Sequence, residues 1–536
     1  MSQPVALNTT SPRAIPEWVR GLVRLILIGL AMQLVYVVYV VAFPLISNTQ
    51  AGGPAADLEI LMRGHRWFAP IYTIGVLLLY YLFWRAMRLI QNLSRLTAHA
   101  PRFTPDRTWP FKIVVLAFGL LFGSTLVWLY PITANDLFRY VLRGRIWAVY
   151  GASPMLSPPN DFPDDPYIAF AGEFGDWASG YGPLWEIVVQ VPLRLGATDM
   201  VPGAIGLKLV VLLSFLVCAV LIGWFAAPEK GSSSISSACP CSPSSLTALT
   251  FFAWNPLILM QGPGNGHNDR VFMALMVSGI ILWRHKLWWG AAVALTLAAL
   301  TKATALLMIP FFAVLLLRDE PTWRQRIVKG LAAALVGLAM AYLIYSVLGP
   351  VSETLQSVSA MLTTRRGFAI ASGLRMVLRE IIPRHVAETL PCTTGRYIFL
   401  IFYAWLLLQL WRNKLDLVTA GFLAYFSQLM LGRTFRIWYP TWLVPLAALC
   451  LTPATFWRTL LFGLTAELSI VNYFVVWRWW LRDLPWGKWG PLSPYWNYWT
   501  IMHTLTVPWL FGIPLFGPII MRWWGRKKIS ENTLVF

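Results

Sequence analysis

The sequence predicts an all-α, polytopic transmembrane helical bundle, and three observations lead to this fold class. Of the 536 residues, 57% are hydrophobic and only 12% are charged, and the mean hydropathy is +0.60. Such a chain has too little polar surface to cover a soluble globule of its size. Long apolar runs recur along the whole chain, and the 29 Trp and 19 Tyr residues fit the aromatic belts found at membrane interfaces.

The apolar runs give the order of the elements and predict about 13–15 spans in a single membrane domain covering residues 1–536. They lie near residues 22–46, 68–90, 111–133, 203–226, 246–261, 269–284, 287–301, 303–318, 330–348, 397–411, 415–431, 441–453, 458–476 and 498–521. The short apolar run Pro183–Leu195 is interpreted as re-entrant or half-buried, because a full crossing there would invert every later loop. Residues 229–245 are rich in Ser and predict a flexible linker.

The formal net charge of +20 indicates membrane topology. Basic residues lie mostly between apolar runs, as the positive-inside tendency requires, so we expect no nucleic-acid partner. This topology makes residues 134–182 the first large extracytoplasmic loop and residues 349–396 a second, arginine-rich one. The five Cys residues lack metal-ligand spacing, so they predict no zinc site.

The first large loop opens with a short amphipathic segment. Asp136, Arg139 and Arg143 stand at offsets of three and seven residues, which places them on one side of a helix. Apolar side chains take the other side, and Arg145 alone falls on the wrong arc. We therefore expect an interfacial helix that lies flat on the bilayer with its charges outward. The alternative role for Asp136 is structural, as a helix cap that pairs with Arg139 or Tyr140.

A second polar block, Gly264-Asn-Gly-His-Asn-Asp-Arg270, stands at the mouth of a predicted span. Two roles are open for His267, Asn268 and Asp269: binding sugar hydroxyls or a phosphate, or holding a divalent ion together with Asp136. Asn268 or Asp269 could also simply cap the next helix. We assign no metal site, because octahedral magnesium or manganese requires more oxygen ligands than these residues supply.

Several motifs together resemble the GT-C superfamily of polytopic glycosyltransferases, in its bacterial polyprenyl-phosphate-mannose-dependent branch. The motifs are Asn135-Asp136-x-x-Arg139-Tyr140, Gly151-x-x-Pro154, Tyr181-Gly182-Pro183-Leu184, Asn255-Pro256-Leu257 and Gly264–Asp269. The resemblance implies a GT-C-like bundle. It also implies transfer of a hexose, mannose by analogy, from a polyprenyl-phosphate donor to a glycan or glycolipid acceptor on the extracytoplasmic face. Asp136 takes the role of general base, and a single displacement would invert the anomeric centre.

Cations that could bind the donor phosphate come from several segments. Arg139 and Arg143 lie beside Asp136, with Tyr140 and Tyr181 in the same loop. The loop 349–396 contains six arginines and no lysine, of which we select Arg365 and Arg366; anionic lipid head groups are the alternative partner. Arg433 and Arg436 precede Trp438-Tyr439, which could stack on a sugar or belong to the aromatic belt. Lys302, between two apolar runs, either snorkels or contacts the phosphate.

A transporter or flippase of lipid-linked sugars is the rival function. Transporters carry inverted repeats and midplane charges, whereas the ionisable residues here gather in outer loops and at helix ends. A ligase that moves a whole glycan from a lipid diphosphate would also use outer arginines. The expected partners are therefore the donor, the acceptor and membrane lipids, and the only cofactor left open is a divalent cation.

Overall fold

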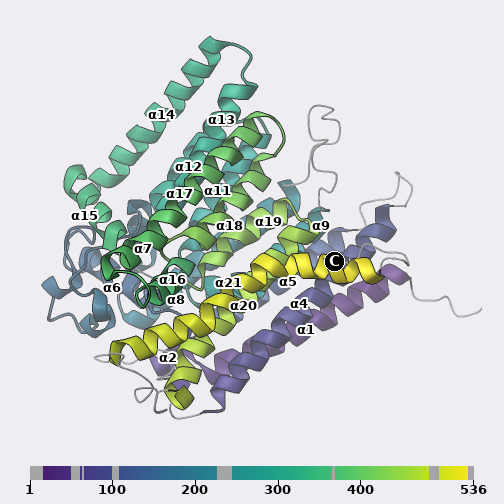
Figure 1. The fold of residues 1–536 in the computed structure, drawn as a ribbon, viewed down its shortest axis with the longest axis horizontal. Coiled ribbons are helices and arrows are strands. Elements are labelled where there is room, and N and C mark those ends of the chain that lie inside the picture. Colours follow the sequence, from purple (N-terminus) through teal and green to yellow (C-terminus); the bar gives the residue numbers. More distant parts are fainter. Residues whose placement is uncertain are drawn as a thin grey trace, which may run out of the picture.

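The computed structural model describes residues 16–49, 61–62, 66–98, 108–225, 244–364, 368–481 and 494–528. It confirms the all-α bundle, drawn in Figure 1. These residues contain no β-strand, and their single antiparallel bridge joins Pro44 to Leu129. All but the last two residues of the predicted linker 229–245 lie outside the described residues.

The helices follow one another closely, and several are interrupted by short 3-10 or π turns. The first half contains α1 (Glu17–Ala42), α2 (Leu45–Asn48), α4 (Phe68–Ala98), α5 (Trp109–Leu126), α6 (Asp136–Ala148), η1 (Pro159–Asp161), η2 (Ile168–Phe174), α7 (Pro183–Arg194), α8 (Met200–Val220), η3 (Leu221–Phe225), α9 (Ser245–Ala253), α10 (Pro256–Leu259) and η4 (Met260–Gly264). The second half contains α11 (Asp269–Arg284), α12 (Trp288–Thr301), η5 (Ala303–Met308), α13 (Ile309–Asp319), α14 (Trp323–Ser346), α15 (Val351–Thr364), α16 (Ile370–Leu378), α17 (Arg384–Trp411), α18 (Leu417–Leu431), η6 (Tyr439–Trp442), α19 (Leu443–Leu449), α20 (Pro453–Val471), η7 (Asn472–Leu481) and α21 (Pro494–Lys528).

Seven helices within the described residues are long and apolar enough to cross a membrane. They are Glu17–Ala42, Phe68–Leu93, Trp109–Leu126, Met200–Phe225, Trp323–Ser346, Arg384–Trp411 and Met502–Met521. Helices α12 and α18 are apolar but shorter. The run predicted at 246–261 is divided into α9 and α10, because Pro256 disfavours a helical conformation at Asn255, whose side chain instead caps Leu257 N–H at 3.1 Å. The total number of crossings stays a prediction.

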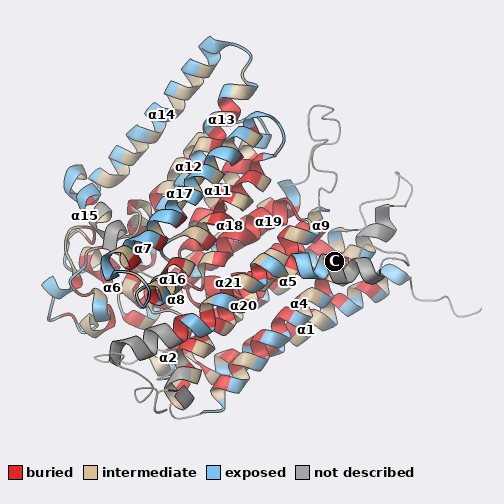
Figure 2. Cartoon of the chain, in the orientation of Figure 1, coloured by how far each residue is buried: buried red, intermediate tan, exposed pale blue. Residues whose placement is uncertain are grey.

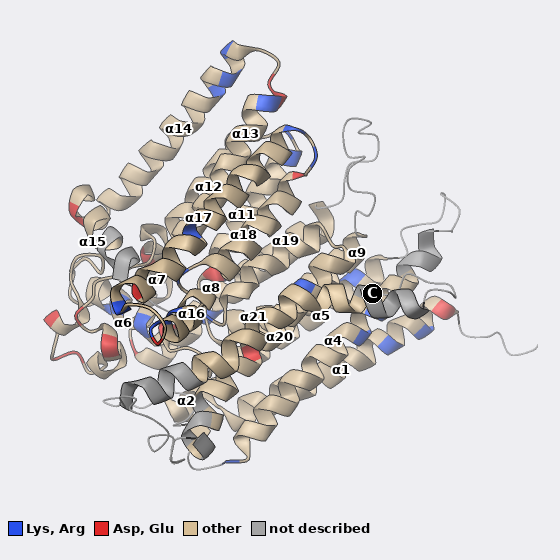
Figure 3. Cartoon of the chain, viewed as in Figure 1, with Lys and Arg blue, Asp and Glu red and all other residues tan. Residues whose placement is uncertain are grey.

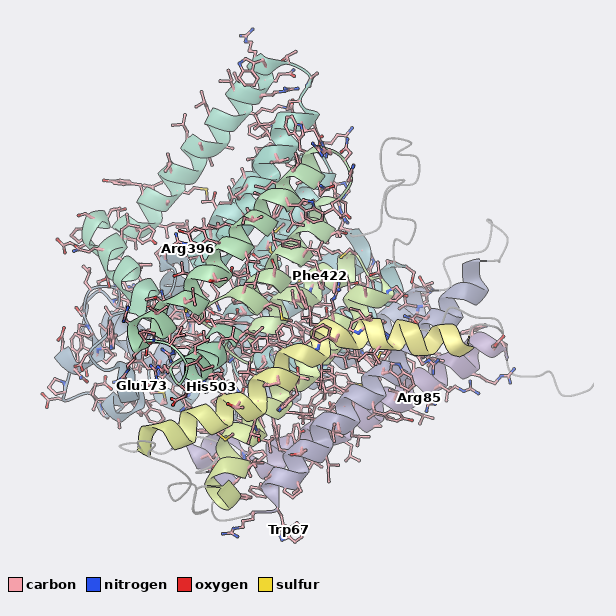
Figure 4. The ribbon with its side chains drawn as sticks, in the orientation of Figure 1. Trp67, Arg85, Glu173, Arg396, Phe422 and His503 are labelled. Carbon is pink, nitrogen blue, oxygen red and sulfur yellow. The ribbon has the colours of Figure 1, made fainter. Side chains whose placement is uncertain are left out.

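Helices α11, α18 and α19 are largely buried and lie at the centre of the bundle in Figure 2. Charged residues gather mostly at helix ends (Figure 3). Arg85 of α4 and Glu173, in the loop 134–182, lie on opposite sides of the molecule (Figure 4).

The prediction that the Asp136 helix lies flat on a bilayer with its charges outward is wrong. Helix α6 packs against α7 and α8, and its polar side is buried as well as its apolar side: Asp136 is 9% exposed and Arg143 2%. The loop that follows folds over the helix. Arg145, which broke the amphipathic pattern, forms a buried ion pair with Asp165 at 2.9 Å.

The Arg145–Asp165 pair fastens this loop to α6. Asp165 also accepts hydrogen bonds from Tyr150 Oη and from the Tyr167 backbone N–H, each at 2.9 Å. Arg145→Met leaves a buried carboxylate without its cation, so we expect a loss of about 3–5 kcal/mol in the free energy of unfolding. The measurement is the melting temperature in detergent. Arg194 is an exposed arginine over the ring of Trp147, and Arg194→Met is the matched control, which should change the melting temperature little. Equal melting temperatures of the two variants would refute the stabilising role of the Arg145–Asp165 pair.

Helix α7 agrees with the interpretation of Pro183–Leu195 as half-buried. Its 12 residues extend over only about 18 Å, too short for a bilayer. Trp185 is fully buried on its inner side and contacts Tyr140 of α6 with ring centroids 5.1 Å apart. Helix α7 therefore packs against the inner side of α6 and helps to hold it in place.

Candidate functional site

A cavity of about 760 Å³ opens beside the start of α6, a volume within the range of sites for small ligands. Its walls come from the loop 132–136 with α6, the loop 173–182, the α12–α13 junction, α14, α15, α17, α18 and the segment 433–442. Eight of the predicted site residues line it, namely Asp136, Arg139, Tyr140, Arg143, Tyr181, Lys302, Arg433 and Arg436. Segments up to 300 residues apart in sequence thus meet at Asp136.

Asp136 is the first residue of α6, and Asn135 before it forms no side-chain cap hydrogen bond. The carboxylate accepts a hydrogen bond from Arg139 at 3.1 Å, one turn along the same face. The pairing predicted for a structural Asp136 is therefore present, but the residue also borders the cavity. Arg139 lies over the ring of Phe174 at 4.1 Å, which fixes its guanidinium against the loop.

Arg143 lies deeper in the same wall, over the Tyr181 ring at 5.6 Å. Tyr181 meets Tyr140 edge-on, with centroids 4.9 Å apart. Behind them, Ser179 Oγ donates to the carboxyl of Glu186. Burial raises the pKa of Glu186, while the charge of Arg143 and the Ser179 hydrogen bond act in the opposite direction.

Lys302 is held at the opposite wall by Asp269. Its Nζ atom donates to Asp269 Oδ1 at 2.7 Å, and Asp269 is fully buried, whereas 17% of the Lys302 side chain is exposed. Trp442 Nε1 donates to the same carboxylate, and the rings of Tyr439 and Trp442 lie 5.4 and 5.3 Å from the ammonium. Lys302 therefore presents its charge to the cavity from a fixed position.

The cavity lining combines several cations with an apolar path. Its lining side chains include five cations against two carboxylates, Asp136 and Glu173. From Lys302 the lining continues along η5 and the start of α13 to Pro310, a length of roughly 12–16 Å. The apolar lining around this path is Leu306, Leu307, Pro310, Tyr345, Phe399, Leu400 and Tyr403. An anionic group attached to a long apolar chain fits this combination.

The residues 262–268, which hold most of the second polar block, are entirely buried. The π turn η4 packs against α5 and α8, and His267 stacks on Trp438 with ring centroids 4.2 Å apart. His267 and Asn268 do not line the cavity, and Asp269 reaches it through Lys302 and Trp442. Asn268 precedes α11 without a side-chain cap bond. Within the described ranges, no three His, Cys, Asp or Glu side chains form a group able to hold a metal ion.

His267 makes the stability depend on pH. Burial lowers the pKa of His267 from 6.5 to about 4, although Asp136 and Asp269 oppose the shift. Between these values the unfolded chain binds the proton and the folded chain does not, so stability falls as the pH drops from 6.5, by about 3 kcal/mol near pH 4. Melting temperatures measured in detergent from pH 7 to 4 should decline more steeply for the wild type than for His267→Gln. Parallel curves would contradict this.

Arg365 and Arg366, the arginines selected from the loop 349–396, lie outside the described residues, so their role stays a prediction. Of the loop's described arginines, none lines the cavity, and Arg375 and Arg379 both pair with Glu388. Sequence reasoning missed Glu173, Phe174, Gln428 and Trp442, which do line it. Glu173 lies in the loop already singled out, but it is one of several acids there without a distinguishing pattern; Trp442 belongs to a run assigned to a span.

Comparison with known proteins assigns the chain to a family. Residues 25–318, more than half of the chain, match the family described as alpha-(1->6)-mannopyranosyltransferase, N-terminal domain. The chain is also similar to alpha-(1->6)-mannopyranosyltransferase A of Mycobacterium tuberculosis (strain ATCC 25618 / H37Rv), with 25% identity over 242 residues. The match covers 43% of this chain, and the chain spans 44% of the length of that relative.

Proposed function

This chain belongs to the alpha-(1->6)-mannopyranosyltransferase family, and we propose that it transfers mannose from a polyprenyl-phosphate donor to a glycan or glycolipid acceptor. The observation that carries the proposal is the cavity, whose lining combines Asp136 and five cations with an apolar path. The reaction occurs on the extracytoplasmic face, and the product linkage is α-(1→6), by analogy with the family's description.

The donor phosphate binds between Lys302 and the arginines of the segment 433–436, because charge-assisted hydrogen bonds to phosphate are the strongest that these side chains make. Its polyprenyl chain follows the apolar lining toward Pro310. Trp438 and Tyr439 offer aromatic faces to the sugar. The donor phosphate and the acceptor hydroxyl are thereby brought to Asp136.

Asp136 removes the proton of the acceptor's primary hydroxyl as that oxygen attacks the anomeric carbon. The bond between this carbon and the phosphate oxygen breaks, and its electron pair leaves with the polyprenyl phosphate. The cations stabilise the added negative charge. A single displacement inverts the anomeric centre, so a β-linked donor gives an α product.

The test uses purified protein with radiolabelled polyprenyl-phosphate mannose and a mannose-terminated glycolipid acceptor. Formation of an α-(1→6)-linked product supports the proposal. Absence of transfer, combined with movement of the labelled lipid across vesicles that contain the protein, would favour a transporter or flippase. A parallel assay with EDTA tests whether a divalent cation is needed. Undiminished transfer would mean that the side chains alone stabilise the charge of the leaving phosphate.

A further inference from the structure

Two charged residues in the helical core take no part in the cavity. Lys208 of α8 and Glu467 of α20 are 0% and 1% exposed, and neither lines the cavity or forms an ion pair among the described residues. Ionisable groups inside a membrane protein are energetically expensive and usually have a specific role. Both of these residues are connected to the same stretch of chain, residues 126–135, which leads from the end of α5 to Asp136.

Lys208 holds the first part of this stretch. Its Nζ atom donates to the carbonyl oxygens of Leu126, at 3.3 Å, and Leu129. Leu126 is the last residue of α5, where helix carbonyls lack intrahelical partners and attract a positive charge. The backbone N–H of Tyr130 donates to Phe43 O at 2.8 Å, which fastens the next residue to the end of α1.

Glu467 holds the last part through Gln261 of η4. Its carboxylate accepts hydrogen bonds from Tyr72 Oη and from Gln261 Nε2, both at 2.7 Å. Gln261 Oε1 accepts in turn from Thr133 Oγ1 at 3.1 Å and from Asn265 Nδ2 at 3.2 Å. Asn265 contacts Thr133 twice more: its Nδ2 atom donates to Thr133 Oγ1 at 2.7 Å, and its Oδ1 atom accepts from the Thr133 backbone N–H at 3.3 Å.

The carboxylate fixes the direction of this network. The Glu467 carboxyl accepts from both Tyr72 and Gln261, so Gln261 turns its NH2 group toward Glu467 and its carbonyl toward Thr133. That carbonyl receives the Thr133 hydroxyl and the Asn265 amide. Gln261 and Asn265 are fully buried, and an unmet donor there would be costly. The Glu467 carboxyl therefore determines, through Gln261, how the chain is held three residues before Asp136.

We propose that Glu467, acting through Gln261, is a positioning residue that holds the segment 133–135 and so aims the Asp136 carboxylate into the cavity. The proposal rests on the proposed function, in which Asp136 is the base. Glu467 itself does not contact the substrate. Its role is to limit the movement of a group whose displacement by about 1 Å can slow a reaction up to a hundredfold.

The test is a reciprocal exchange of the acid and the amide. Glu467→Gln lets the Gln261 amide turn around, and Gln261→Glu places two carboxyl groups in contact, so each single variant should lower kcat at least about tenfold. The double variant can satisfy every donor again: the amide now at position 467 accepts from Tyr72 and donates to the carboxylate now at position 261, which accepts from Thr133 and Asn265. Its kcat should return to within about threefold of the wild type. The donor KM should change little, because Lys302 and the arginines 433 and 436 lie on other segments.

Two further measurements separate positioning from general destabilisation. Ser469→Ala removes a buried hydroxyl from the same helix, one that donates to Ala466 O at 2.7 Å, and should leave kcat unchanged. Hydrogen–deuterium exchange of residues 130–140 should be faster in Glu467→Gln and slow again in the double variant. An unchanged kcat with unchanged exchange in Glu467→Gln would refute the proposal. It would also be refuted if the loss of kcat in the double variant equalled the product of the losses in the two single variants. Inactivity of the wild type would refute the proposed function, whereas exchange would still decide the positioning.

Discussion

Replacing Asp136 by Asn is expected to lower kcat about 10²- to 10⁴-fold, the range supplied by a well-placed general base. The amide retains the shape of the carboxylate and an oxygen that can accept from Arg139, which lies 3.1 Å from it, so the fold and the donor site should persist. The donor KM should therefore remain within a few-fold of the wild-type value. The measurement is steady-state transfer with the labelled donor, at saturating acceptor.

Two comparisons make this result specific. Asp164→Asn removes an exposed carboxylate of the same loop and should have no effect on kcat. Glu173→Gln removes the other carboxylate of the cavity. If Glu173→Gln abolished transfer while Asp136→Asn left it intact, the base would be Glu173 and the assignment of Asp136 would be wrong.

Replacing Lys302 by Met should raise the donor KM by about 10- to 100-fold, because a hydrogen bond to a charged group contributes about 1.5–3 kcal/mol. The same change leaves Asp269, which is fully buried, without its cation. Loss of one partner of a buried pair destabilises a protein by about 3–5 kcal/mol. We therefore expect a lower melting temperature together with weaker donor binding.

The double variant Lys302→Met with Asp269→Asn separates the two effects. The introduced amide carries no charge, and its oxygen can still accept the hydrogen bond that Trp442 gives to Asp269, so the melting temperature should recover. The donor KM should remain high because the cation is absent. Recovery of both properties would mean that Lys302 serves only to neutralise Asp269 and does not bind the phosphate.

Local spacing was enough to predict part of this site. The helical repeat placed Asp136 and Arg139 on one face, and the structure has them in contact. The helical repeat could not predict which other segments of the chain cover that face. Arg145 looked misplaced on the helical wheel because its partner, Asp165, lies 20 residues further on in a loop without periodicity.

Partners far apart in sequence escaped prediction entirely. Lys302 and Asp269 are 33 residues apart and Gln261 and Glu467 are 206 residues apart, and neither pair carries a local signal. The burial of residues 262–268 was missed for a related reason. Gly, Pro and Asn are typical of exposed turns, but here a π turn carries them into the core.

Helix α14 has no buried residue along its 24 positions and stands at the edge of the bundle (Figure 1), yet its Tyr345 borders the cavity. Around α14 the acyl chains of lipid or detergent take the place that packed side chains occupy around the inner helices. The surrounding amphiphile is therefore in effect a structural component of the cavity wall that α14 forms. Transfer rates of different variants should therefore be compared only when all of them are measured in the same environment, either detergent micelles or lipid nanodiscs.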